Sequence, residues 1–274
     1  MRTAFSVSPL NAIFVAILQY YSSQMRYVKA ITRIILIISV LIIIIWAIVS
    51  VPKHQCESIT VAPHTQNESL VLGQAEVERM LSADSIAILG MPMKDIDVAA
   101  ITRLLSANPY VEKVNFIHFS GSRLVVDYTL KHIILHAFSQ DGDQYFVDDS
   151  GCLLPYTAKM QDDLPVANGH IPQHYKQGDT ARGRLAEMVN IVNAIQKDEF
   201  CQAQFRQLYL NEQNQIELVP AVGSHVVLFG NDQNIEEKLE NLKLLYQEGL
   251  TRKGFDTYAQ LDVRFKNRII AKRK

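Results

Sequence analysis

The sequence has only three cysteines among 274 residues, and no two of them stand in a Cys-x-x-Cys pair. Three is too few for a disulfide framework, and their spacing does not suit a zinc ribbon or a thiol redox motif. A single bridge between Cys152 and Cys201 stays open. The odd count favours instead thiols that pack as small buried apolar groups.

Motifs of nucleotide-binding and hydrolytic enzymes are also missing. The chain has neither a G-x-G-x-x-G nor a G-x-x-x-x-G-K segment, so it lacks a loop that would cradle phosphates. No G-x-S-x-G elbow occurs, and Ser120-Gly121-Ser122 falls in an expected hairpin turn. These absences argue against an enzyme and against a bound cofactor, although they leave open a catalytic set assembled from distant residues.

A metal site has little basis in the sequence. His132 and His136 are four residues apart, but on a strand that spacing separates them by about 13 Å. The aspartates of residues 141–149 do not follow the calcium-loop spacing. We therefore expect no metal centre.

Charge is nearly balanced, with 27 basic and 28 acidic residues and a formal net charge of −1. A nucleic-acid-binding protein would normally carry a clear basic excess, so that class is disfavoured. The balance differs along the chain, because residues 1–51 hold four basic residues and no acidic one. The chain therefore divides into a basic N-terminal segment and a mildly acidic remainder.

A stretch of 18 uncharged and almost wholly apolar residues runs from Ile34 to Val51, and Pro52 and Lys53 follow it. Its 18 residues would form a helix about 27 Å long, close to the thickness of the bilayer hydrocarbon. A buried core helix, which is the alternative, would normally show a polar face. The sequence predicts a transmembrane helix over residues 34–51.

The flanks of this stretch predict its orientation. Arg26, Lys29 and Arg33 precede it, so the positive-inside rule places residues 1–33 in the cytoplasm and exports residues 52–274. A cleaved signal peptide is the competing interpretation, but its apolar region should span only about 7–15 residues. Met25 opens a short basic lead, and we interpret residues 1–24 as an extension ahead of the true start.

Residues 52–131 are expected to form a small α+β domain. Their hydrophobic periodicity predicts the order strand, helix, helix, strand, strand, with both helices covering one face of the sheet. Asp95 is the expected N-cap of the second helix, which must end before Asn108-Pro109. The expected ranges are Ile59–Val61, Gln74–Leu81, Asp95–Ser106, Val111–Phe119 and Leu124–Leu130.

Residues 132–274 are expected to form a second domain, rich in strands, with two amphipathic helices. The helices are expected over Arg184–Lys197 and Asn234–Gly249, the second one ending at its glycine. The strands include a hairpin and a meander, over Ile134–Phe138, Gln144–Val147, Phe205–Asn211, Gln215–Val219 and Ser224–Phe229.

The last stretch, Tyr258–Ala271, alternates apolar and polar residues and is expected to be a single strand. At a sheet edge its free N–H and C=O groups could pair with a strand of another chain. In the interior of a sheet it would be an ordinary structural strand. The sequence leaves both positions open.

The order of these segments resembles the FtsQ/DivIB family of bitopic bacterial cell-division proteins, in the form found in Bacteroidetes. The first exported unit resembles the POTRA domain of that family. The likeness rests on the motifs Asn108–Val114 (NPYVEKV), Tyr145–Gly151 (YFVDDSG), Leu164–Val166, Ile216–Gly230 and Tyr258–Phe265 (YAQLDVRF). Two departures stand out: Leu130–Ile134 lacks the proline of the family, and Phe265 replaces the more usual tyrosine.

The resemblance implies a scaffold of the division machinery (the divisome) at the septum of the inner membrane, without catalysis or cofactor. It implies that the last strands bind FtsB- and FtsL-type partners by strand addition and so help to recruit the FtsW–FtsI-type septal peptidoglycan synthase. The POTRA-like unit is tied to recruitment. Matching positions give the candidate partner-binding residues Arg264, Phe265, Lys266, Asn267 and Ile269. The alternatives are another membrane-anchored POTRA protein, acting in envelope or outer-membrane protein assembly, and an anchored envelope hydrolase.

Overall fold

The computed structural model describes residues 28, 31–46, 55–64, 72–83, 88–160 and 163–274. The chain divides into two units, residues 1–54 and 55–274, and each is described by itself. The proposed start at Met25 lies outside the described residues, as does the end of the apolar stretch after Trp46.

In the first unit, residues 31–46 are helical. The large apolar side chains of this helix are all exposed, with Trp46 at 69%. Within the ranges that the structure describes, no helix is both long enough and apolar enough to cross a bilayer. The predicted span of residues 34–51 runs past the described helix, so it stays a prediction.

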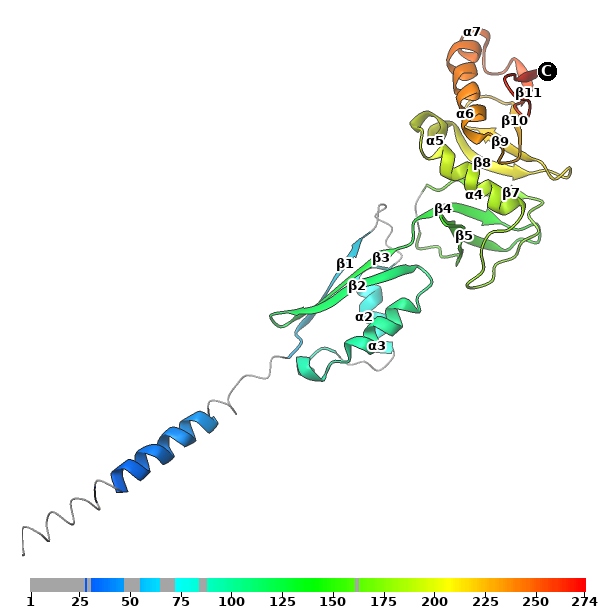
Figure 1. Cartoon of the computed structure of the whole chain (residues 1–274). Helices are drawn as coiled ribbons and strands as arrows, with labels where there is room; N and C mark the ends of the chain where they lie inside the picture. The colour runs from blue at the N-terminus through cyan, green and yellow to red at the C-terminus, as the bar shows by residue number, and fades with distance from the viewer. Residues whose placement is uncertain (1–27, 29–30, 47–54, 65–71, 84–87, 161–162) are drawn as a thin grey trace, which may run out of the picture. The chain divides into compact units, whose positions relative to one another are not determined.

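The second unit begins with a three-stranded sheet in the order β1-β3-β2. Strand β1 runs parallel to β3, and β2 runs antiparallel to it. The expected order of strand, helix, helix, strand, strand is confirmed (Figure 1). The elements are β1 (Ser58–His64), α2 (Gln74–Ala83), η2 (Met93–Asp95), α3 (Val98–Ser106), β2 (Val111–Ser120) and β3 (Arg123–Leu130).

The start of α3 differs from the expectation. The helix begins at Val98, and the carboxylate of Asp97 accepts a hydrogen bond from the N–H of Ala100 at 3.0 Å. Asp95 belongs instead to the short helix η2. The N-cap is therefore Asp97, because only its side chain reaches a free N–H of the first turn.

The core of this first part joins one face of each helix to alternate residues of the sheet. Val77 from α2 and Ile101 from α3 are fully buried, as are Leu124 and Val126 from β3. The hydroxyl of Tyr128 donates a hydrogen bond to the carbonyl of Leu72, so this buried phenol keeps a partner.

The rest of the unit forms a nine-stranded sheet in the order β12-β11-β10-β9-β8-β7-β4-β5-β6. Strand β7 pairs parallel with both β4 and β8, so it joins the two halves of the sheet. The strands are β4 (Ile133–Phe138), β5 (Gln144–Asp148), β6 (Leu153–Pro155), β7 (Val166–Gly169), β8 (Phe205–Leu210), β9 (Ile216–Pro220), β10 (Val226–Gly230), β11 (Tyr258–Asp262) and β12 (Ile270–Arg273).

The helices of this domain pack on the sheet and bury its largest core. Met188 and Val192 of α4 and Leu242 of α6 are fully buried in the same cluster as Phe205 and Leu208 of β8. The helical elements are α4 (Arg184–Ile195), α5 (Glu199–Gln204), α6 (Ile235–Leu244), the π-helical turn η3 (Leu245–Leu250) and α7 (Thr251–Lys253). An α+β fold with a β-rich C-terminal domain is thereby confirmed.

The expectation that the last helix ends at Gly249 is wrong. The helical path continues through η3 and α7, and the chain leaves it at Gly254, whose φ is +89°. The N–H of Gly254 donates to the carbonyl of Leu250 at 2.8 Å, which satisfies a carbonyl of the last turn. A glycine in the left-handed region is a usual helix terminator, and the sequence offers two candidates five residues apart.

Buried phenols and a buried thiol make the fold sensitive to alkali. Burial raises the pKa of Tyr128 to about 12, raises the pKa values of Tyr145 and Tyr246, and raises the pKa of the Cys201 thiol to about 12. The unfolded chain releases these protons at lower pH, so above about pH 9 it binds fewer protons than the folded chain and stability falls as pH rises. Burial lowers the pKa of Lys238, and this group opposes the trend.

We expect the free energy of unfolding to drop by about 1.4 kcal/mol for each buried tyrosine at pH 11, relative to neutral pH. Urea unfolding at pH 8 and pH 11, with a reductant present, measures the change. In the Tyr128→Phe variant, the drop in the free energy of unfolding between pH 8 and pH 11 should be smaller by the contribution of one tyrosine. An unfolding midpoint that does not move between the two pH values would contradict the expectation.

Candidate partner-binding edge

The outermost strand of the nine-stranded sheet is β12, which follows β11 in an antiparallel hairpin. Ile270 lies opposite Asp262, and Ala271 lies opposite Leu261. All four residues of β12 are exposed, and no strand among the described residues covers its outer side. Of the two positions that the sequence left open, the structure places the end of the chain at a sheet edge.

The opposite edge of the sheet, strand β6, is covered by its own chain. The N–H of Leu153 donates to the carbonyl of Asp179 at 2.9 Å, and Cys152 forms a bridge with Thr180. The N–H of Ala181 donates to the carbonyl of Gly151 at 2.7 Å. A loop therefore pairs with residues 151–153 at the start of β6, whereas no strand among the described residues pairs with the outer side of β12.

The expectation of one continuous strand over Tyr258–Ala271 is wrong. Strand β11 ends at Asp262, and residues 263–269 form a connection to β12. The carboxylate of Asp262 accepts from the backbone N–H of Arg264 at 3.1 Å, which turns the chain, and Asn267 adopts a left-handed φ of +58°. Alternation in the sequence hides this reversal, because apolar and polar residues continue to alternate from Val263 to Lys266, past the end of β11.

Arg264 is held by the strand that precedes it. Its Nε and Nη2 atoms donate to the two carboxylate oxygens of Asp262 at 3.0 and 2.7 Å. Partial burial raises the pKa of Asp262, but the hydrogen bonds from Arg264 outweigh it and keep the pKa below its usual value. The guanidinium therefore shapes the connection, and its bidentate pairing leaves less of it available to a carboxylate on a partner.

The other four candidate residues occupy different environments. Phe265 is 39% exposed, and the guanidinium carbon of Arg268 lies 5.0 Å from the centre of its ring. Lys266 is exposed, and the backbone N–H of Asn267 donates to Glu237 of α6 at 3.1 Å. Ile269 is half-buried against the main core. The structure thus gathers these residues into one connection at the β12 edge, with none of them on a strand.

Sequence reasoning missed that the basic end of the chain is itself the edge strand. Lys272 and Arg273 belong to β12, and the Nζ of Lys274 donates to Ser224 at 2.5 Å and lies 3.8 Å from Asp256. The Ile269-Ile270 pair after an Asn-Arg dipeptide is the signal that could have located the strand.

We expect Arg264→Ala to loosen the connection between β11 and β12. Loss of the bidentate pair should lower the free energy of unfolding by about 1 kcal/mol, since the pair is only partly buried. Hydrogen exchange of the β12 amides should accelerate more than that of β8. The matched variant Lys266→Ala removes the same charge from an exposed site and should leave β12 exchange unchanged; equal effects of the two variants would contradict the positioning role.

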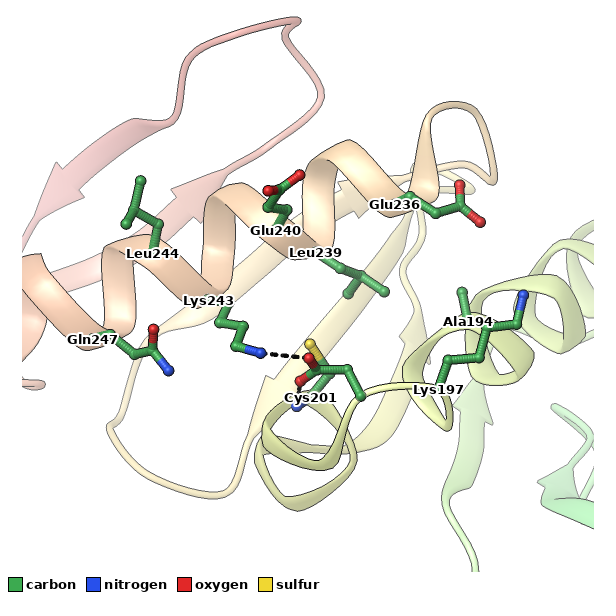
Figure 2. Close-up of a pocket in the computed structure, with 10 residues that line it drawn as sticks. Ala194, Lys197, Cys201, Glu236, Leu239, Glu240, Lys243, Leu244 and Gln247 are labelled. Carbon is green, nitrogen blue, oxygen red and sulfur yellow. Dashed lines mark hydrogen bonds and ion pairs between the residues drawn. The ribbon is translucent and has the colours of Figure 1, made fainter.

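A groove of about 490 Å³ lies between α6 and the start of α5, and Figure 2 shows Lys243, Glu240 and Glu236 along its α6 side. The Nζ of Lys243 lies 2.5 Å from Asp198. This hydrogen bond, together with one from the N–H of Cys201, lowers the pKa of Asp198. Lys243 and Asp198 thus neutralise each other, as expected of an ion pair that ties the start of α5 to α6.

Cys201 does not make this groove a thiol active site. Its side chain is 1% exposed, and burial raises the pKa of the thiol to about 12, so the nucleophilic thiolate is not formed near neutral pH. Cys56, Cys152 and Cys201 all carry free thiols. Over the described ranges, no cluster of His, Cys, Asp or Glu could hold a metal ion.

The fold is thus a small α+β domain followed by a mixed sheet, with the C-terminal strand β12 outermost among the described strands. Two family models match the chain: one described as a POTRA-like domain, over residues 54–128, and one described as FtsQ/DivIB, C-terminal related, over residues 134–272. The second match covers half of the chain, and the protein belongs to this FtsQ/DivIB-related family. No curated protein matches the chain.

Proposed function

We propose that the protein is a membrane-anchored scaffold of the cell-division machinery. Its β12 edge binds an extended segment of an FtsB- or FtsL-type partner and so helps to recruit and control a septal peptidoglycan synthase of the FtsW–FtsI type. The family to which the chain belongs suggests a division role and consists generally of non-enzymatic scaffolds. The POTRA-like domain contributes to recruitment.

The observation that carries the proposal is the contrast between the two edges of the sheet. A loop pairs with the start of β6, while β12 exposes all four of its residues, and on the side away from β11 no strand in the described part of the chain pairs with it. Main-chain pairing along such an edge supplies register and affinity, and alternate side chains supply selectivity. The basic residues of β12 favour a partner segment that carries acidic side chains.

The membrane anchor of the proposal is the apolar stretch Ile34–Val51, with residues 1–33 in the cytoplasm and residues 52–274 in the periplasm. The exposed apolar side chains of helix 31–46 support it, because such a surface is stable when lipid covers it. The excess of basic residues before the stretch supports the orientation.

A pull-down tests the partner. Full-length protein and a variant lacking residues 268–274 are tagged and purified from membranes of the native cell. We expect FtsB- and FtsL-type proteins with the full chain only. Equal recovery with both forms would move the partner site away from β12.

Depletion of the protein followed by microscopy tests the role in the cell. Filaments with unclosed septa support the division scaffold. Normal septation with loss of outer-membrane proteins would replace it by a role in envelope assembly. Cleavage of purified cell wall by the protein, abolished by one polar substitution, would replace it by a hydrolase.

A further inference from the structure

A tight turn in the POTRA-like domain carries apolar side chains at its tip. The N–H of Met91 donates to the carbonyl of Ile88 at 3.2 Å, and Gly90 between them has a φ of +80°. Leu89 is 60% exposed and Met91 is 37% exposed. Turn tips usually carry Gly, Pro, Asn, Asp or Ser, so a leucine at this position has no explanation in the turn itself. Residues 88–91 are called the Leu89 turn below.

The Leu89 turn is hydrogen-bonded to the place where the chain enters the domain. The N–H of Cys56 donates to the carbonyl of Met91 at 3.0 Å, and the N–H of Gly90 donates to the carbonyl of Cys56 at 2.8 Å. Gln55 forms an antiparallel bridge with Pro92. The exposed apolar tip is thereby fixed beside residue 55.

Residue 55 cannot be far from the membrane if the proposed anchor is correct. Gln55 is the fourth residue after Val51, the last residue of the apolar stretch, and four residue steps reach at most about 14 Å in any conformation. The headgroup layer beyond the hydrocarbon is about 5–8 Å thick on each side. The Leu89 turn therefore lies within reach of the lipid interface.

The charges around the Leu89 turn are balanced. Lys94 and Asp95 follow the turn closely in the sequence, Glu57 follows Cys56, and Arg123 pairs with Ser58; all four side chains are exposed. A patch without net charge gains little from anionic lipid, so the driving force must come from burial of the leucine and methionine side chains. Single exposed apolar residues are common on protein surfaces, but here two of them lie together where the chain enters the domain.

We propose that the Leu89 turn inserts Leu89 and Met91 into the interface of the membrane that anchors the chain. This contact fixes which end of the POTRA-like domain faces the lipid. The inference rests on the membrane anchor of the proposed function.

Quenching of tryptophan fluorescence by brominated lipid tests the contact. Full-length protein is placed in nanodiscs of uncharged phosphatidylcholine, brominated near the glycerol end of the acyl chains. The single native tryptophan, Trp46, reports on the anchor. Two further variants, both in a Trp46→Phe background, are Leu89→Trp and the control Leu244→Trp, whose leucine on α6 is similarly exposed at 54%.

We expect quenching of Trp46 in the parent protein and quenching by about half in Leu89→Trp, with none in Leu244→Trp. Quenching of Trp46 without quenching in Leu89→Trp would overturn the inference and leave the anchor intact. If Trp46 is not quenched, the apolar stretch does not lie in the membrane, and both the proposed anchor and the proposed insertion of Leu89 are contradicted. Quenching in Leu89→Trp that needs added anionic lipid would overturn insertion driven by apolar burial.

Discussion

A proline in β12 whose missing N–H would have faced the free edge is expected to abolish partner binding while the hairpin stays folded. Ala271 and Lys272 are neighbours, and one of them is this position. The backbone groups of successive residues in a strand point to opposite edges, and both residues lie in continuous register with β11, opposite Leu261 and Gln260. One substitution therefore removes a donor that faces β11, and the other removes a donor at the free edge.

The variant that loses the outward donor should bind the FtsB- or FtsL-type partner at least about 100-fold more weakly, since a partner carbonyl is left unpaired and the proline ring blocks close approach. Hydrogen exchange of the β11 amides identifies this variant, because β11 stays protected in it and becomes exposed in the other. Lys272→Ala keeps the N–H and controls for loss of the charge. Wild-type affinity in both proline variants would exclude strand addition at β12.

Much of the fold could be predicted because its elements have a clear period. The stripe of α3 and the alternation of β3 each bury one face, so their positions follow from hydrophobic spacing. The errors fell at the ends of elements. Asp97 rather than Asp95 caps α3, and Gly254 rather than Gly249 ends the last helix. In each case two similar residues lie close together, and tertiary packing decides between them.

The candidate site was located more coarsely than the fold. The resemblance directed attention to the end of the chain, and the structure places that end at an open edge. The hairpin itself escaped prediction, because the turn depends on the contact between Asp262 and Arg264 and on the left-handed Asn267 rather than on a Gly-containing turn. The sequence also did not predict which strand is outermost. The strand order depends on the crossover from β10 through α6 to β11, which runs parallel to β10.

The open edge also depends on the middle of the sheet, where we expect Gly169→Ala to cause the largest loss of stability. Gly169 lies opposite Leu210 at the end of β7, with a φ of +98°. A Cβ atom there would collide with the carbonyl oxygen of Leu210 and lie 2.9 Å from its nitrogen. Because these are backbone atoms of the paired strand, no side-chain rotation relieves the clash, and β7 must separate from β8.

We expect Gly169→Ala to lower the free energy of unfolding by more than about 4 kcal/mol, measured by urea denaturation. Gly142→Ala is the matched control: its φ is +93°, but nothing lies within 4 Å of the added Cβ. The Gly142→Ala variant should lose only the free energy that the left-handed backbone conformation costs an alanine, about 1–2 kcal/mol. Similar losses in the two variants would show that φ strain, rather than the close approach of β7 to β8, governs the effect. Since β8 to β12 form one continuous run of paired strands, separation at Gly169 should also reduce partner binding at β12, which the control variant should retain.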